Sequence, residues 1–256
     1  MGTRTEHAPG TFSWIDLSTS DTEAAKSFYG GLFGWEFEDN EIPGGGVYTM
    51  CKVGGSEAAA ISGLKEGDPS PPHWNNYVTV ANAGDAAAKA GELGGTVVMD
   101  AFDVMEAGRM AVIADPTGGV FSVWEAKENI GAQRVNEPGC LTWNELHSPD
   151  PDKAVEFYTG LFGWETEPME TPEGAPSYTI VKVGDRSNGG VMDAQGGEPP
   201  HWLPYIVAAD RDVTADKATG LGGTEFVRLE MPAGKIAILA DPQGAAFAIF
   251  EGELDD

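Results

Sequence analysis

The chain has 256 residues, of which 41% are hydrophobic and 22% are charged, and this composition is typical of a folded protein with one large domain or two ordinary ones. Its 41 acidic and 15 basic residues give a net charge of −26, so its surface repels nucleic acid and anionic lipid. We therefore expect neither a nucleic acid nor a membrane partner. The simplest interpretation of this charge is a soluble, self-repelling surface, although it would also attract a cationic ligand.

The first predicted element is a strand over residues 11–18, where side chains alternate between two faces. Trp14 and Asp16 share one face, and Leu17 lies on the other. A helix follows, capped by Asp21 and ended by Gly34. Its buried stripe is predicted from helical spacing and comprises Ala25, Phe28, Tyr29 and Leu32.

The following elements are short and bounded by glycines or turns. We expect strands at residues 35–38, 47–53, 58–64 and 73–80, a helix at 85–93, and strands at 97–104, 109–114 and 120–125. The order is therefore βαβββ, repeated once.

The whole pattern then occurs a second time. The segments Phe28–Glu36 and Phe157–Glu165 differ at one position only, and later motifs recur in the same order. These motifs are Pro-Pro-His-Trp, Leu-Gly-Gly-Thr and Asp-Pro-x-Gly, at residues 71–74 and 199–202, 93–96 and 221–224, and 115–118 and 241–244. Ordered matches over both halves indicate an internal duplication whose unit is a domain.

We place the first domain at residues 8–127, a linker at 128–138 and the second domain at 139–253. The linker stretch is polar and lacks periodicity, which favours a connecting segment. Each half is long enough to bury its own core.

The sequence shows no sign of export or of a disulfide framework. Residues 1–10 lack the apolar core of a signal peptide, and no apolar run reaches about 18 residues. The two cysteines, Cys51 and Cys140, lie at non-equivalent positions of the repeat. We therefore expect a cytoplasmic protein.

Three segments carry a family resemblance: SDTEAAKSFYGGLFGWE, PPHWNNYVTVANAGDAAAKAGELGG and ADPTGGVFSVWE, each with a counterpart after Cys140. With the βαβββ order, they resemble the vicinal oxygen chelate superfamily of glyoxalases, extradiol dioxygenases and bleomycin resistance proteins. The resemblance implies an α+β fold of two tandem domains, each with paired βαβββ modules that form an open, cup-shaped sheet. It also implies an intrachain pseudo-dimer and leaves further homo-oligomers open.

The resemblance further implies a divalent metal held by His, Gln or Glu from the first strand of each module and by a Glu from the last strand. These positions fall on Trp14, Asn75 and Ser122 in the first copy. In the second copy they fall on Trp143, Leu203 and Ala248. None of these residues is a good ligand, so we expect no cofactor.

A two-residue slip keeps a side chain on the same strand face and offers an alternative. In the second copy it brings in Glu145, His147 and His201 as a metal set, with Glu145 and His147 also candidates for acid–base catalysis. The first copy has no full set. A divalent metal in the second domain is therefore the alternative to a metal-free cup.

The faces that carry Trp14 with Asp16, and Trp143 with Glu145, are predicted to point into the cups. A flat ring beside a carboxylate suits a planar or cationic ligand. Tyr48, Asn75 and Tyr178 are further candidate ligand-binding residues. The competing interpretation is that Trp14 and Trp143 simply fill the cups as core.

His73 and His201 each follow a pair of prolines. We favour a structural role in which the ring bonds a backbone carbonyl, against a role as general base. Glu125 and Glu251 end the last strands and are predicted to be surface caps.

These residues and motifs favour two functions. The first is binding of an aromatic or cationic metabolite or antibiotic without the family metal. The second is a divalent-metal-dependent lyase or dioxygenase reaction of the glyoxalase type in the second domain.

Overall fold

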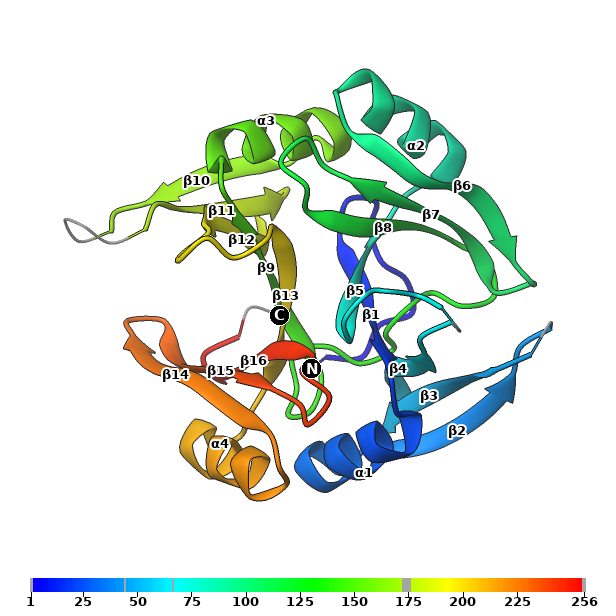
Figure 1. Ribbon diagram of the computed structural model, residues 1–256. Helices are drawn as coiled ribbons and strands as arrows, with labels where there is room; N and C mark the ends of the chain where they lie inside the picture. The colour runs from blue at the N-terminus through cyan, green and yellow to red at the C-terminus, as the bar shows by residue number, and fades with distance from the viewer. Residues whose placement is uncertain (1, 44, 66, 172–175, 255–256) are drawn as a thin grey trace.

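The structure is a computed structural model that describes residues 2–43, 45–65, 67–171 and 176–254 (Figure 1). The first domain contains β1 (Phe12–Thr19), α1 (Thr22–Phe33), β2 (Glu36–Glu41), β3 (Val47–Val53), β4 (Ser56–Gly63), β5 (His73–Thr79), α2 (Ala83–Glu92), β6 (Thr96–Val104), β7 (Gly108–Ala114) and β8 (Val120–Ala126). The second contains β9 (Leu141–Ser148), α3 (Pro151–Phe162), β10 (Glu165–Met169), β11 (Tyr178–Val183), β12 (Arg186–Asp193), β13 (His201–Val207), α4 (Arg211–Gly220), β14 (Thr224–Met231), β15 (Gly234–Ala240) and β16 (Ala246–Gly252).

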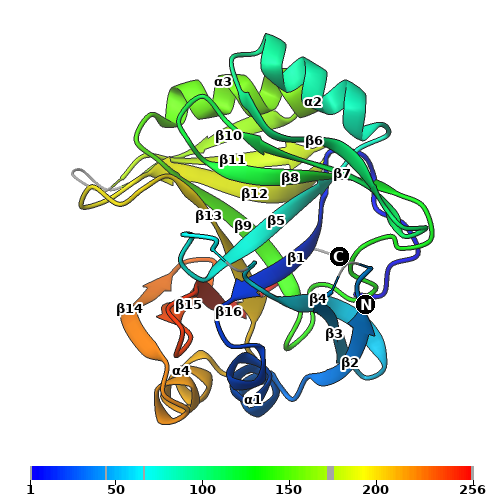
Figure 2. The same cartoon turned by 45° about the vertical axis from the view of Figure 1, so that its right-hand side comes forward.

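Each domain is one eight-stranded mixed sheet. The strand order is β2-β3-β4-β1-β5-β8-β7-β6 in the first domain and β10-β11-β12-β9-β13-β16-β15-β14 in the second. The first strands of the two modules lie antiparallel at the centre of each sheet. Figure 2 shows these central strands crossing the middle of the molecule. The predicted fold class, with paired βαβββ modules in tandem domains, is confirmed.

Local signals in the sequence set the ends of the first helix of each domain. The Asp21 side chain accepts a hydrogen bond from the backbone N–H of Ala24, and Gly34 ends α1 in the left-handed conformation at φ 73°. In the second domain Asp150 caps α3, and Pro151 occupies its first turn, where no backbone N–H is needed. Helix α2 begins two residues before its predicted start, because Asn82 is its cap.

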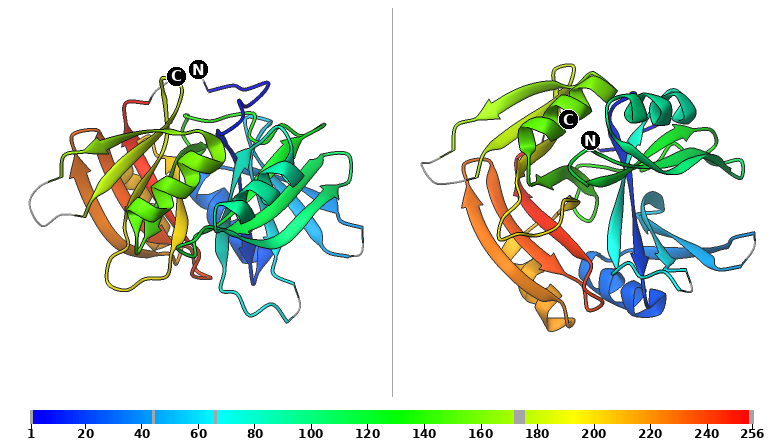
Figure 3. Two further views of the ribbon diagram at one scale, coloured as in Figure 1. Left: turned by 90° about the horizontal axis from the view of Figure 1, so that it is seen from above. Right: turned by 45° about the horizontal axis from the view of Figure 1, so that its top comes forward.

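The two domains share their cores. The predicted stripe of α1 is buried, but it packs on β15, β16 and α4 of the second domain as well as on its own sheet. Helix α3 packs in the same way on β7, β8 and α2 of the first domain. The helix pairs α1–α4 and α2–α3 therefore lie side by side across the domain boundary (Figures 1 and 3). Each half also buries a cluster of its own on the face away from the helices, while the helix-side cores are shared between the domains.

Hydrogen bonds between the repeated motifs join the domains. The Tyr29 hydroxyl donates to Asp241 Oδ2 at 3.1 Å, and the Tyr158 hydroxyl donates to Asp115 Oδ2 at 2.8 Å. The Trp35 indole likewise donates to the carbonyl oxygen of Gly139 at 2.8 Å. The motifs that reveal the duplication are thus the residues that hold the intrachain pseudo-dimer together.

The predicted linker is not a free connection. Residues 129–135, called the strap below, cross the first sheet near the start of β1. The backbone N–H groups of Ala132 and Gln133 donate to Ser13 O at 2.7 Å and to Glu57 O at 2.8 Å. Ala132 is fully buried. The domain boundaries themselves remain predictions.

None of the described helices is long and apolar enough to cross a membrane.

Candidate functional site

Each sheet has a helix face and an opposite face, called the cup face, that carries Trp14 and Asp16 or Trp143 and Glu145. On the first strands the expected alternation holds, since Leu17 and Leu146 are buried in the shared helix-side cores. The aromatic-and-acid faces therefore look away from the helices, as predicted.

In the first domain the cup face centres on the buried carboxylate of Asp16. It accepts hydrogen bonds from Tyr48 at 3.0 Å, Tyr77 at 2.8 Å and the Asn75 amide at 2.7 Å. Burial raises the pKa of Asp16, although these hydrogen bonds oppose the shift. The amide of Asn75 donates to Asp16, so this residue serves the carboxylate network.

The strap fills this first cup. Ala132 and Val135 belong to one buried cluster with Trp14, Tyr77 and Trp124 on the cup face. The Trp124 indole donates to the carbonyl oxygen of Asn129 at 2.9 Å, and residues 2–7 in turn bond the strap. In the first domain Trp14 therefore packs against the protein's own chain. The assignment of Trp14, Asp16, Tyr48 and Asn75 as ligand-binding residues stays a prediction, as does the competing core interpretation of Trp14.

In the second domain the cup face centres on Glu145, which is 5% exposed. Its Oε1 accepts from the Tyr205 hydroxyl at 2.7 Å and lies 3.1 Å from His147 Nε2. The Trp143 indole donates to the Tyr178 hydroxyl at 3.0 Å. Burial and the neighbouring Glu145 charge raise the pKa of Tyr178. The structure thus brings together Trp143, Glu145, His147 and Tyr178, while their roles as ligand-binding or catalytic residues stay predictions.

Among the residues that the structure describes, strand residues make up the apolar cluster around this centre. Its members, buried or half-buried, are Trp143, Leu203, Tyr205, Ile236, Ile238, Ala246, Ala248 and Phe250. On the neighbouring edge strand Leu229 pairs with Ile236, which places it on the same face, and it is 44% exposed. The second cup face is therefore apolar, and solvent reaches part of it.

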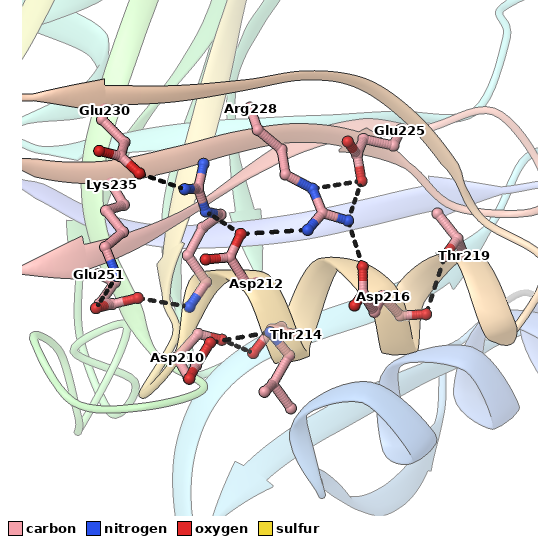
Figure 4. Close-up of polar contacts among 12 residues, drawn as sticks. Asp210, Asp212, Thr214, Asp216, Thr219, Glu225, Arg228, Glu230, Lys235 and Glu251 are labelled. Atoms are coloured by element: carbon pink, nitrogen blue, oxygen red, sulfur yellow. Dashed lines mark hydrogen bonds and ion pairs between the residues drawn. The ribbon is translucent and has the colours of Figure 1, made fainter.

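The opposite face of β14 is charged and belongs to the scaffold. Figure 4 shows Arg228 between Glu225 on its own strand and Asp212 and Asp216 on α4. The buried guanidinium of Arg211 donates to the carbonyl oxygens of Leu229 and Ile236. This network fastens α4 to β14 and β15 and does not reach the cup face.

Glu125 and Glu251 also have structural roles. Glu125 accepts from the backbone N–H of Ala83 at 2.9 Å, and Glu251 accepts from that of Arg211 at 2.8 Å. Each carboxylate thus accepts a hydrogen bond from a backbone N–H that has no partner within the first turn of the second helix of its domain. These residues are caps, as predicted.

A cluster of His147, Glu198 and His201 lies beside Glu145, at the ends of β9 and β13. His147 Nδ1 lies 2.8 Å from Glu198 Oε1, and the two imidazole centroids are 4.7 Å apart. Burial lowers the pKa of His147, but the hydrogen bonds and charges of Glu145 and Glu198 outweigh it and raise the pKa. Burial, with repulsion from His147, lowers the pKa of His201.

The proline-flanked histidines bond the backbone, as the structural interpretation expects. His73 Nδ1 lies 2.8 Å from Pro71 O, and His201 Nδ1 lies 3.0 Å from Pro199 O. His201 differs from His73 only in its neighbours, since His147 stands where the first domain has Ser18.

The residues at the positions implied by the family resemblance do not fit a metal. Trp143, Leu203 and Ala248 offer no suitable donor, and the last two are buried apolar side chains. The alternative metal set of Glu145, His147 and His201 needs one change. Donor atoms of His147, Glu198 and His201 all lie within 4.8 Å of one another, and Glu198 takes the place predicted for Glu145. Sequence reasoning missed Glu198 because it lies in a loop outside any strand pattern.

Sequence reasoning also missed Tyr77 and Tyr205, which hold the two buried acids. Each lies two residues beyond a predicted cup-face position on the same strand, at equivalent places in the repeat. A tyrosine that recurs at this position in both copies was the sequence feature that could have identified them.

Two shallow surface recesses lie outside both cup faces. One of about 340 Å³ lies against Glu23, Lys26 and Phe37. The other, of about 260 Å³, lies between the domains against Pro9, Asn82 and Leu161. Neither is lined by a buried acid or a histidine, so the candidate site is the second cup face.

Comparison with known proteins gives a consistent family. The Glyoxalase/Bleomycin resistance protein/Dioxygenase superfamily matches residues 11–123, and the Glyoxalase-like domain matches residues 143–250. A Mycobacterium tuberculosis protein named "Putative glyoxylase CFP32" is 43% identical over 98% of each chain. The anthracycline biosynthesis protein DnrV of Streptomyces peucetius is 32% identical over 96% of this chain and 95% of its own.

Solved structures share the fold at low identity. The 2,3-dioxygenase LapB from Pseudomonas sp. KL28 superimposes with a TM-score of 0.70 at 14% identity, over 98% of this chain and 96% of that one. The Mn(II)-bound glyoxalase from Novosphingobium aromaticivorans gives 0.69 at 15% identity, over 100% and 85%. With a family domain matched in each half, the chain belongs to the glyoxalase/bleomycin resistance protein/dioxygenase superfamily.

Proposed function

We propose that this protein binds a small, planar aromatic molecule with a cationic group on the cup face of its second domain. The observation that carries the proposal is the buried Glu145 carboxylate, which lies among Trp143, Tyr178 and Tyr205 on a face whose apolar cluster, among the described residues, consists of strand residues.

The chemistry of this face suits such a ligand. Aromatic and aliphatic side chains offer area for a flat ring system to pack against. The polar groups beside them are Glu145, His147 and Glu198, two carboxylates flanking one imidazole. Even with His147 protonated, one negative charge is in excess, and the net charge of −26 steers cations toward the protein.

The two cups differ in access, which supports one site per chain. In the first cup the strap packs against Trp14, which is 6% exposed. Trp143, the equivalent of Trp14, is half-buried.

One of the named relatives supports the ligand class. Anthracyclines are flat, multi-ring aromatic compounds, and many carry a protonated amino sugar. A relative that covers nearly the whole chain is named for anthracycline biosynthesis. An anthracycline with an amino sugar is therefore a suitable first probe.

Isothermal titration with this anthracycline and with its sugar-free aglycone tests the proposal. We expect one ligand per chain. Glu145→Gln should weaken binding of the cationic compound by about 10- to 100-fold, since it removes an interaction with a charged group, and should affect the aglycone less.

Asp16→Asn is the matched control, because it makes the same chemical change on the closed cup and should leave the affinity unchanged. Two ligands per chain, equal effects of the two substitutions, or no saturable binding would contradict the proposal.

A second candidate is a glyoxalase- or dioxygenase-type reaction in the second domain. It is favoured by two histidines, His147 and His201, paired across β9 and β13 beside Glu145. In that reaction Glu145 would move a proton on a substrate with vicinal oxygens, and a divalent metal would supply Lewis acidity. Turnover of a hemithioacetal or a catechol with added divalent metal, abolished by Glu145→Gln, would support it. No turnover with any divalent metal would exclude it.

A further inference from the structure

We propose that His147, Glu198 and His201 form a binding site for one divalent transition-metal ion, at the ends of β9 and β13 and away from the positions that the family resemblance implies. This inference does not depend on the ligand proposed above.

The three side chains converge on one point. His147 and His201 are direct partners in the antiparallel register of β9 and β13, so their side chains project from the same face. Glu198 reaches them from the loop before β13, and the three donor atoms lie within 4.8 Å of one another. Donors around a tetrahedral ion with bonds near 2.0–2.1 Å lie about 3.4 Å apart, so small side-chain rotations bring them into place.

The surroundings orient both imidazole rings for ligation. A metal-bound histidine usually donates its other N–H to a carboxylate or a backbone carbonyl. His147 Nε2 lies 3.1 Å from Glu145 Oε1, and His201 Nδ1 lies 3.0 Å from Pro199 O. These partners leave Nδ1 of His147 and Nε2 of His201 as the lone-pair nitrogens. Nδ1 already faces the Glu198 carboxylate at 2.8 Å, where an ion would replace the shared proton.

The first domain lacks this donor set at the equivalent place. His73 makes the same bond to a backbone carbonyl as His201, but Ser18 and Ser70 stand where the second domain has His147 and Glu198. In the part of the chain that the structure describes, the His147–Glu198–His201 group is the one that brings together metal-binding donors in this way.

The donor set selects the kind of metal. Two imidazoles and one carboxylate suit zinc, cobalt, nickel or iron, whereas calcium and magnesium prefer oxygen donors only. Three protein ligands leave at least one coordination position open for water or a bound molecule.

The test is titration of the chelator-treated full chain with Co²⁺, followed by visible absorption, and with Zn²⁺, followed by calorimetry. Both are done at 0.15 M salt with excess Mg²⁺, so that exposed acids do not compete. We expect one ion per chain. His201→Ala and Glu198→Gln should each weaken binding at least tenfold, and His73→Ala, the matched control, should leave it unchanged.

Glu198→Gln keeps both histidines and changes a loop residue, so it reports on ligation even if His201→Ala folds poorly. Unchanged affinity in Glu198→Gln, an equal loss in His73→Ala, or weak binding of many ions per chain would overturn the proposal. Anthracycline titration of the chelator-treated protein separates this outcome from failure of the proposed ligand site.

Discussion

At the scale of single residues, the two buried acids show how one position of a repeat can serve different ends. Asp16 and Glu145 occupy equivalent places, and each accepts a hydrogen bond from an equivalent tyrosine, Tyr77 or Tyr205. Tyr48 and Tyr178 are also shared, since each bonds the acid and accepts from Trp14 or Trp143, and the remaining partners diverge. Asp16 accepts a further hydrogen bond from the neutral amide of Asn75, whereas Glu145 has the imidazole of His147 beside it.

The burial of Asp16 predicts a pH dependence of stability. Its pKa in the folded protein is raised above the ordinary value of 3.8, so the folded state holds this proton more tightly than the unfolded state. Its favourable contribution is complete below pH 3.8 and is lost as the pH rises through the raised folded pKa. Urea unfolding of wild type and Asp16→Asn across this range should show the wild type losing stability relative to the variant. Parallel pH profiles would contradict this.

At the scale of elements, the strap is the feature that separates the two cups. Its path depends on Gly131, which has φ 97° and whose Cβ, if present, would lie 2.5 Å from Ser13 O. A side chain here would both strain the backbone and push the strap from β1.

Gly131→Ala should therefore lower the free energy of unfolding by about 1–3 kcal/mol. The control is Gly244→Ala, at φ 99° with open space around the Cβ position, which carries the backbone strain alone. Chemical denaturation of both variants measures the difference. If Gly244→Ala costs as much as Gly131→Ala, close packing of the strap is not the cause.

At the scale of the whole molecule, the shared cores make the two domains one cooperative unit. Helix α1 also packs on the second sheet and α3 on the first, so each sheet loses part of the cover of its apolar face when the domains part. We expect one unfolding transition for the full chain.

Tyr29→Phe tests this coupling. It removes the hydroxyl that donates to Asp241 Oδ2 across the boundary. Because this buried acceptor is left without its donor, the free energy of unfolding should fall by about 1–3 kcal/mol. The whole transition should shift as one when it is followed by calorimetry and by tryptophan fluorescence together. Two separated transitions, in the variant or in the wild type, would show that the domains unfold independently.

Much of this architecture could be predicted from the sequence because its signals are local. Strand alternation at residues 11–18, the Asp21 and Asp150 caps and the terminating glycines depend on neighbours in the chain. The duplication follows from ordered repeats, and the grouping of Trp143, Glu145 and His147 follows from the two-residue period of one strand.

Only the tertiary structure decided which cup is filled and what lies beside Glu145. The polar segment of residues 129–135 has no pattern that marks it as buried, yet its backbone completes hydrogen bonds with Ser13 and Glu57, far away in the sequence. Glu198 likewise meets His147 through a loop. Short-range periodicity fixes the direction in which a side chain points, whereas the partner that it meets depends on distant segments, and this difference separates what the sequence determined from what the fold decided.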